Sequence, residues 1–108
     1  MTDEKPDGAA LIAAERQRQV SEEGWTPAHD DEHDDGSIAG AGASYAALAA
    51  RQIGSGLHAA EATAPPSQVW RWSSEFWKPS EDPLRNLVRA GALIAAEIDR
   101  LQREQAGR

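Results

Sequence analysis

The sequence predicts an all-α protein, a small bundle of three to four helices that is completed by oligomerisation. Three segments of helical length, 8–23, 37–53 and 83–105, predict this fold class because each is flanked by helix-capping residues. The last of them carries apolar residues at spacings of three and four along its whole length. Of the 108 residues 21 are alanine, which favours helix but buries little surface. The helices must therefore pack very closely or share a core between chains, and we favour a homo-oligomer.

The first helix is expected to follow a disordered tail, residues 1–7, and to open a single helical domain over 8–108. Asp7 is a suitable N-cap and Gly24 is a suitable C-terminal stop. The next segment, GWTPAHDDEHDDG (24–36), is bounded by glycines and broken by a proline. We expect a structured loop there, with at most one helical turn.

The second helix, 37–53, is expected to be capped by Asp35 or Ser37. It is rich in glycine, alanine and serine, and such small residues allow another backbone to come close. Residues 54–67 are rich in glycine, alanine and proline and are expected to connect the elements on either side. The sequence Ser-Glu-Asp-Pro at 80–83 offers an N-cap followed by a proline in the first turn of the last helix.

The formal net charge of −7 is concentrated in one segment. Seven acidic residues and no lysine or arginine lie between Glu22 and Asp35, so the rest of the chain is formally neutral. Such a run is either a solvated loop or a local site. The charge argues against a protein that coats nucleic acid, because such proteins show a basic face.

Two further observations bear on localisation and chemistry. No stretch approaches the roughly 18 to 20 apolar residues that span a bilayer, and the polar start of the chain is unlike a signal peptide. The chain has no cysteine, which excludes a disulfide framework and a cysteine nucleophile. We therefore expect a cytoplasmic protein with no membrane partner.

The acidic segment contains side chains that bind metals. Carboxylates are the ligands that Mg²⁺ and Mn²⁺ prefer, whereas its two histidines lack the central glutamate of a zinc-protease motif. A site for Mg²⁺ or Mn²⁺ across the bundle would use the candidate ligands Glu15, Glu22, Asp30 and Asp31. The alternative for these residues is structural hydrogen bonding, with Asp30 or Asp31 capping a helix.

Four of the six aromatic residues lie within 70–77, close to several basic side chains. This combination suits a nucleotide, because a base stacks on indole rings while cations meet phosphate. Joined with the acidic segment, it gives the candidate ligand-binding residues Trp72, Trp77, Lys78, Arg85, Arg89, Asp30, Asp31 and His33. The tryptophans would stack on the base, the basic residues would hold phosphate, and the others would bind ribose hydroxyls or a metal. The alternative is that the tryptophans only build the core.

At four motifs the chain resembles a recurrent group of small phage and prophage proteins. The motifs are ERQRQVSEEGW (15–25), HDDEHDDG (29–36), FWKP (76–79) and RNLVRAGALIAAEIDRL (85–101). This resemblance implies the product of an accessory phage gene, of the kind that acts in nucleotide metabolism or counter-defence.

More distantly, the chain is similar to the all-α nucleotide pyrophosphohydrolases of the MazG type. That resemblance implies acidic pairs on neighbouring helices that bind Mg²⁺ and split NTPs into NMP and pyrophosphate. Glu22 and Glu23, with Glu15 on the same helix, match part of the pattern. The second expected helix has no acidic residue, and the last has Glu97 and Asp99 two positions apart rather than three.

These observations lead to three hypotheses, and they leave open whether the protein is an enzyme. The leading one is a phage-type accessory protein that binds a phosphorylated nucleotide-like ligand and sequesters a signalling nucleotide of host defence in the host cytoplasm. The second is a MazG-like, Mg²⁺-dependent pyrophosphohydrolase. The third is an inhibitor whose acidic segment imitates the phosphates of nucleic acid.

Overall fold

The computed structural model describes residues 5–58, 65 and 68–107, and every regular element in them is helical. The elements are α1 (Gly8–Glu23), α2 (Pro27–Asp31), α3 (Ser37–Ser55), a short 3-10 helix (Ser74–Phe76) and α4 (Pro83–Ala106). The predicted all-α class is confirmed, and the three long helices end within two residues of their expected bounds. None of the helices in these residues is long and apolar enough to cross a membrane.

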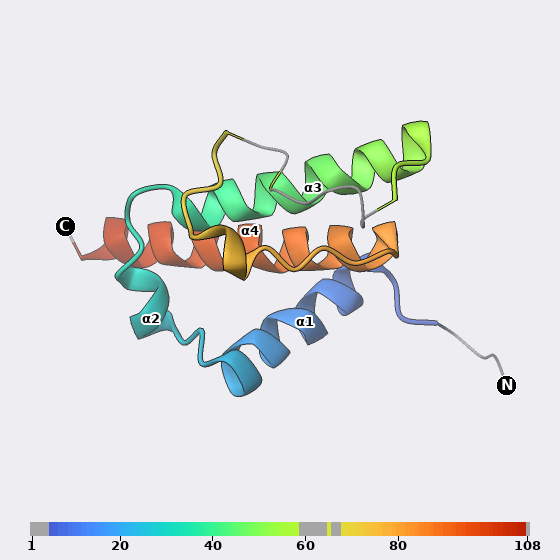
Figure 1. Cartoon of the computed structure of the whole chain (residues 1–108). Coiled ribbons are helices and arrows are strands. Elements are labelled where there is room, and N and C mark those ends of the chain that lie inside the picture. The colour runs from blue at the N-terminus through green and yellow to red at the C-terminus, as the bar shows by residue number, and fades with distance from the viewer. Residues whose placement is uncertain (1–4, 59–64, 66–67, 108) are drawn as a thin grey trace, which may run out of the picture.

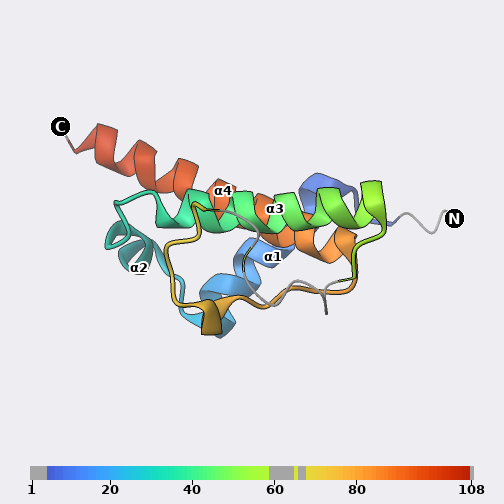
Figure 2. The ribbon, with the colours of Figure 1, turned by 45° about the horizontal axis from the view of Figure 1, so that its top comes forward.

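The longest helix, α4, lies at the centre of the arrangement. Helix α3 runs along one side of it, and α1 and α2 pack against it from the other side (Figure 1). Residues 68–82, which we call the returning segment, run beside α3 and lead into the start of α4 (Figure 2). Helix α4 therefore contacts each of the other three α-helices of the described chain.

The helix ends follow the capping residues expected from the sequence. Asp7 and Asp82 each accept a backbone N–H from the first turn of the helix that follows them. Gly24 ends α1 in the left-handed conformation, with φ at 73°. Helix α3 is the exception, because its N-cap is Gly36, with φ at 85° and no side-chain cap, rather than Asp35 or Ser37. Asp35 only accepts the backbone N–H of Ser37 at 3.0 Å.

The core lies between α3, α4 and the returning segment. Leu48 and Leu93 are at most 2% exposed, and Trp77 packs on Tyr45 with ring centroids 4.7 Å apart. The small residues of α3 allow the expected close approach, because a Cβ at Gly40 would lie 2.1 Å from the carbonyl oxygen of Val69. The returning segment is therefore held directly against the backbone of α3.

A buried asparagine fixes the other end of the returning segment. The side chain of Asn86, which is fully buried, accepts the backbone N–H of Ser80 and donates to the Ser80 carbonyl oxygen. It also donates to Gln52 of α3 at 2.9 Å. One α4 side chain thus joins α3, α4 and the returning segment, which fixes the segment that carries most of the tryptophans.

Parts of the predicted tail and connector lie outside the described residues. Residues 5–7 have no regular structure, and 1–4 are not described. The connector begins later than expected, because α3 continues to Ser55. Most of 59–67 lies outside the described chain.

Candidate ligand-binding site

A pocket of about 380 Å³ opens where the end of α1, α2 and the returning segment meet over α3 and α4. Its volume falls within the roughly 300–1,000 Å³ that is usual for small-molecule sites. It is lined by Glu23, Trp25, His29, His33, Tyr45, Trp70, Trp72, Ser73, Phe76, Lys78, Arg89 and Leu93. Aromatic and imidazole rings dominate this lining, and we call it the aromatic pocket.

Four rings make a closed circuit on one wall of the aromatic pocket. Trp25 is stacked on His29 with the ring planes 6° apart, and the ring centroids of His29 and His33 are 4.8 Å apart. The rings of His33 and Trp72 meet edge-on with their centroids 5.8 Å apart, and the centroids of the Trp72 and Trp25 rings are 6.2 Å apart. The buried indole N–H of Trp72 has no acceptor within the described chain, so ring contacts hold this side chain. We call these four residues the ring wall.

The aromatic surface continues from the ring wall toward the core. Trp70 lies edge-on to Trp72 at 5.5 Å and edge-on to Tyr45 at 6.0 Å. Trp77 lies 5.2 Å from Trp70 but is only 7% exposed. Of the two tryptophans predicted to contact a ligand, Trp72 therefore lines the pocket, whereas Trp77 belongs to the core beneath it.

Two cations stand at the edge of the aromatic pocket. The backbone N–H of Lys78 donates to the Tyr45 hydroxyl at 3.0 Å, and the Lys78 carbonyl accepts a hydrogen bond from the Arg89 guanidinium. That guanidinium also lies 5.1 Å from the centre of the Tyr45 ring. Within the described residues, neither Lys78 nor Arg89 forms an ion pair with a carboxylate. Both positive charges are therefore available to an anion in the pocket.

Asp30 supports the ring wall from behind. It is 3% exposed and accepts a hydrogen bond from Arg16 of α1 at 2.7 Å. Arg16 also donates to the carbonyl oxygen of Trp25 at 3.1 Å, and the second oxygen of Asp30 lies 3.2 Å from Nδ1 of His29. Asp30 is thus a positioning residue that holds two rings of the wall by hydrogen bonds, as the structural alternative expected. The expected helix cap by Asp30 or Asp31 is wrong, because Thr26 caps α2.

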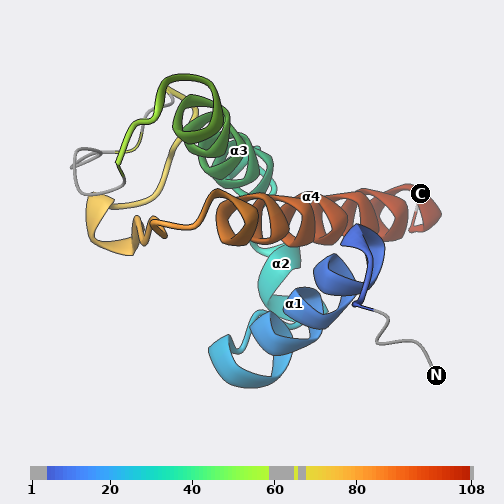
Figure 3. The ribbon, with the colours of Figure 1, turned by 90° about the vertical axis from the view of Figure 1, so that its right-hand side faces the viewer.

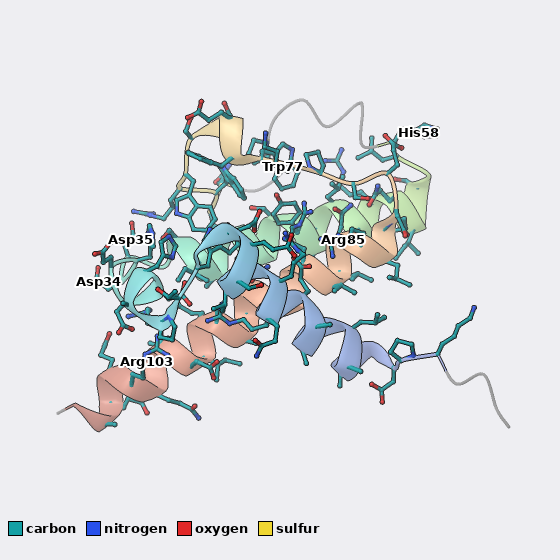
Figure 4. The ribbon with its side chains drawn as sticks, turned by 90° about the horizontal axis from the view of Figure 1, so that it is seen from below. Asp34, Asp35, His58, Trp77, Arg85 and Arg103 are labelled. Carbon is teal, nitrogen blue, oxygen red and sulfur yellow. The ribbon has the colours of Figure 1, made fainter. Side chains whose placement is uncertain are left out.

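Other predicted ligand contacts lie outside the aromatic pocket. Arg85 projects from α4 toward α1, where it donates to Glu15 at 2.8 Å, whereas Trp77 lies in the returning segment (Figure 4). Asp31 pairs with Arg103 near the far end of α4, at 2.8 Å. The structure does not bring Arg85 and Asp31 to the pocket, because their ion pairs with Glu15 and Arg103 hold them elsewhere, whereas Trp77 is buried in the core.

The candidate metal ligands do not share a coordination sphere. Glu15, Asp30 and Asp31 each pair with different arginines, and Glu22 is exposed on α1. In the described part of the chain, no group of three or more side chains of metal-binding type converges. The carboxylates neutralise arginines instead, so this donor set does not fit a Mg²⁺ or Mn²⁺ site.

Glu15 has the most strongly perturbed carboxyl of the described chain. Burial disfavours its charge, but hydrogen bonds from Arg18 at 2.9 Å and Arg85 at 2.8 Å outweigh burial and lower the pKa of Glu15 from 4.5 to about 2. The ionised carboxylate therefore joins α1 to α4. A group with a lowered pKa in the folded state stabilises the fold at pH values above its unfolded pKa.

We expect acid to remove this contribution as the pH falls from about 4.5 toward 2, because Glu15 is then protonated more readily in the unfolded chain. The loss is on the order of 2 kcal/mol, allowing for solvent screening of the partly exposed arginines. Urea unfolding of the wild type and of Glu15→Gln across this range measures it. The difference in stability between the two proteins should shrink as the pH falls, and a constant difference would contradict the assignment.

Trp25, His29 and Tyr45 line the pocket, although the sequence did not predict them as ligand contacts. The spacing of four from Trp25 to His29 and again to His33 was an available signal, since one helical turn brings such residues together. No local pattern marks Tyr45, which reaches the pocket only because α3 packs beside the returning segment.

The chain matches no protein-family model, no curated protein and no solved structure. The class of protein is therefore defined by what the described residues contain, an all-α bundle with one aromatic pocket edged by two cations. The aromatic pocket and its two cations are therefore the basis for assigning a function.

Proposed function

We propose that this protein binds a phosphorylated, nucleotide-like small molecule in the aromatic pocket. The observation that supports this best is the ring wall in the same pocket as Lys78 and Arg89, two cations without a carboxylate partner in the described chain. A flat heteroaromatic group with an attached anion matches both halves of such a site.

Each half of the pocket has a distinct role in this proposal. A base stacks against the rings, and stacking on an aromatic side chain is worth about 1–3 kcal/mol per base. Lys78 and Arg89 neutralise the phosphate through charge-assisted hydrogen bonds. The Lys78 carbonyl and the Tyr45 ring already orient the Arg89 guanidinium, so binding costs it little conformational freedom. In this proposal His33, which belongs to the ring wall, contacts the ribose hydroxyls.

The positions of the carboxylates favour binding over the alternative functions. A MazG-like pyrophosphohydrolase needs carboxylates that converge on Mg²⁺, but here Glu15, Asp30 and Asp31 hold arginines. An inhibitor that imitates nucleic acid needs unpaired acids, yet the same pairing and the contact of Asp35 with Arg71 reduce the free charge of the acidic segment. From the sequence alone, the proposal extends to a phage-type accessory protein that sequesters a host signalling nucleotide in the cytoplasm.

Isothermal titration against nucleoside mono-, di- and triphosphates and cyclic mono- and dinucleotides tests the proposal. We expect at least one phosphorylated compound to bind and its parent nucleoside to bind far more weakly. Replacing Lys78 with glutamine should weaken binding about tenfold, because one charge-assisted contact is lost. Arg85→Gln is the matched control, since Arg85 forms an ion pair with Glu15 and does not line the pocket.

Two results would contradict the proposal. One is an absence of binding across the panel at high micromolar concentration. The other is an equal effect of the Lys78 and Arg85 substitutions on affinity. Release of pyrophosphate from any NTP in the presence of Mg²⁺ would instead support the hydrolase.

A further inference from the structure

Much of the apolar stripe that predicted helix α4 from the sequence is left open by the described chain, because α4 turns Ala90, Leu93 and Ala96 toward the core instead. Leu87, Ile94, Ile98 and Leu101 are between 39% and 51% exposed, and their spacings of seven, four and three place them on one side of the helix. Ile94 also borders α3, because a Cβ at Gly42 would lie 3.0 Å from Cγ1 of Ile94. The stripe therefore runs along the seam between the two helices.

Helix α3 extends this apolar stripe with small side chains. Ala43, Ala46, Ala50 and Ile53 follow one another at spacings of three, four and three, and Ile53 is 66% exposed. From Ser37 to Ala50 the helix has no charged side chain. We call these four residues and the α4 stripe together the α3/α4 face.

The α3/α4 face lies opposite the returning segment. Figure 3 shows α4 running across the view, with the returning segment on one side of the α3–α4 pair and α1 and α2 on the side of α4 away from α3. Within the described chain, no element covers the remaining side of the pair. An uncovered apolar surface of this extent lies at the upper end of what monomers expose, and apolar patches of that size often mark a contact surface.

We propose that the α3/α4 face is the contact surface of a homodimer, in which a second copy packs the same face against it about a two-fold axis. From the exposed fractions of its side chains, the face offers roughly 600 Å² per chain, so self-pairing buries roughly 1,200 Å², which reaches the lower end of the range for stable interfaces. A two-fold interface needs one surface that complements itself. The alanines of α3 meet this need because they let two helix backbones come close.

Charge favours a second copy over a membrane as the occupant. Each chain has a net charge of −7, but the acidic segment is carried by the region around α2, on the other side of α4. Two chains can therefore meet at the α3/α4 face without opposing their acidic segments. An interfacial helix that binds anionic lipid carries lysine or arginine beside its apolar residues, and α3 has none from Ser37 to Ala50.

Light scattering on the purified chain tests this interface. We expect the wild type to have the mass of two chains of 11.6 kDa. Ile98→Lys on α4 and Ala43→Arg on α3 should each weaken dimerisation by more than about 100-fold, because each places one charge from either chain in the apolar interface. Ala13→Lys, on the exposed side of α1, is the matched control and should remain a dimer.

Thermal unfolding of the wild type at several protein concentrations tests the interface even where a substituted chain does not fold. The melting temperature of the wild type should rise over a roughly hundredfold increase in protein concentration, whereas that of a monomer does not. A wild type that is monomeric at every concentration would overturn the proposal, as would a dimer that resists both substitutions. Binding of monomeric wild type to anionic vesicles would assign the face to a membrane instead. Failure of the ligand titrations would leave the dimer unaffected, because the aromatic pocket lies across the α3–α4 pair.

Discussion

Replacing Leu48 with alanine is expected to lower the free energy of unfolding by about 3 kcal/mol, within the range of about 2–5 kcal/mol for buried leucines. Leu48 is 0% exposed and lies in the core between α3 and α4. The substitution removes apolar burial and leaves a cavity that rigid helix packing fills only in part. Because small domains are stable by about 5–15 kcal/mol, the effect is large, and urea unfolding followed by circular dichroism measures it.

Leu84→Ala is the matched control for this experiment. Leu84 is also a helical leucine, but it is 54% exposed in the first turn of α4 and lies outside the α3/α4 face. Its replacement should cost less than about 1 kcal/mol, because little burial is lost. Equal losses from the two substitutions would contradict the position assigned to the core.

Most of the fold could be predicted because its signals are local. The apolar spacing of α4, the caps Asp7 and Asp82 and the stop at Gly24 each depend on residues within a turn or two of one another. The small residues of α3 also indicated a close backbone contact, although they did not identify the returning segment as the partner.

The candidate site was harder to predict, because the partner of a charged side chain is decided by tertiary packing. Arg85 and Arg89 are one helical turn apart and look equivalent in the sequence. Arg85 meets Glu15, a residue 70 positions away, whereas Arg89 turns toward the aromatic pocket. The direction of each arginine depends on how α1 crosses α4, and no local pattern encodes that crossing.

The acidic segment suggested a metal site because the partners of its carboxylates, too, are decided by tertiary packing. Its carboxylates have the right chemistry for Mg²⁺, but ligand spacing along the chain does not show which cations come near after folding. Asp30 meets Arg16 and Asp31 meets Arg103, so two neighbouring acids join α2 to different helices. Part of the local excess of charge is therefore structural, since it ties a five-residue helix to α1 and α4.

The α3–α4 pair gives the two proposals separate surfaces. One side of the pair carries the returning segment and the aromatic pocket, and the other presents the α3/α4 face. Changes to dimerisation and changes to ligand binding can therefore be made independently. This separation allows Ile98→Lys to serve as a binding control, since its affinity for the ligand should equal that of the wild type.

Replacing Trp72 with alanine is expected to weaken binding of the phosphorylated ligand by about 10- to 100-fold, which corresponds to the loss of one stacking ring. The Trp72 ring packs against the rings of Trp25 and His33, with centroid distances of 6.2 and 5.8 Å, so its removal opens the ring wall. Trp72→Phe should lose only a few-fold in affinity, because it keeps an aromatic face. Arg71→Ala is the neighbouring control, since Arg71 is exposed, pairs with Asp35 and does not line the pocket.

Two measurements separate a loss of stacking from a loss of structure. Circular dichroism should show nearly unchanged helix content in Trp72→Ala, because Trp72 is only partly buried and packs against the edge of the core rather than within it. Titration should show the full loss for alanine, little loss for phenylalanine and none for Arg71→Ala. If phenylalanine weakened binding as much as alanine, stacking would not be the source of affinity. If Arg71→Ala weakened binding equally, the ligand would lie outside the aromatic pocket, and the proposed function would need a different site.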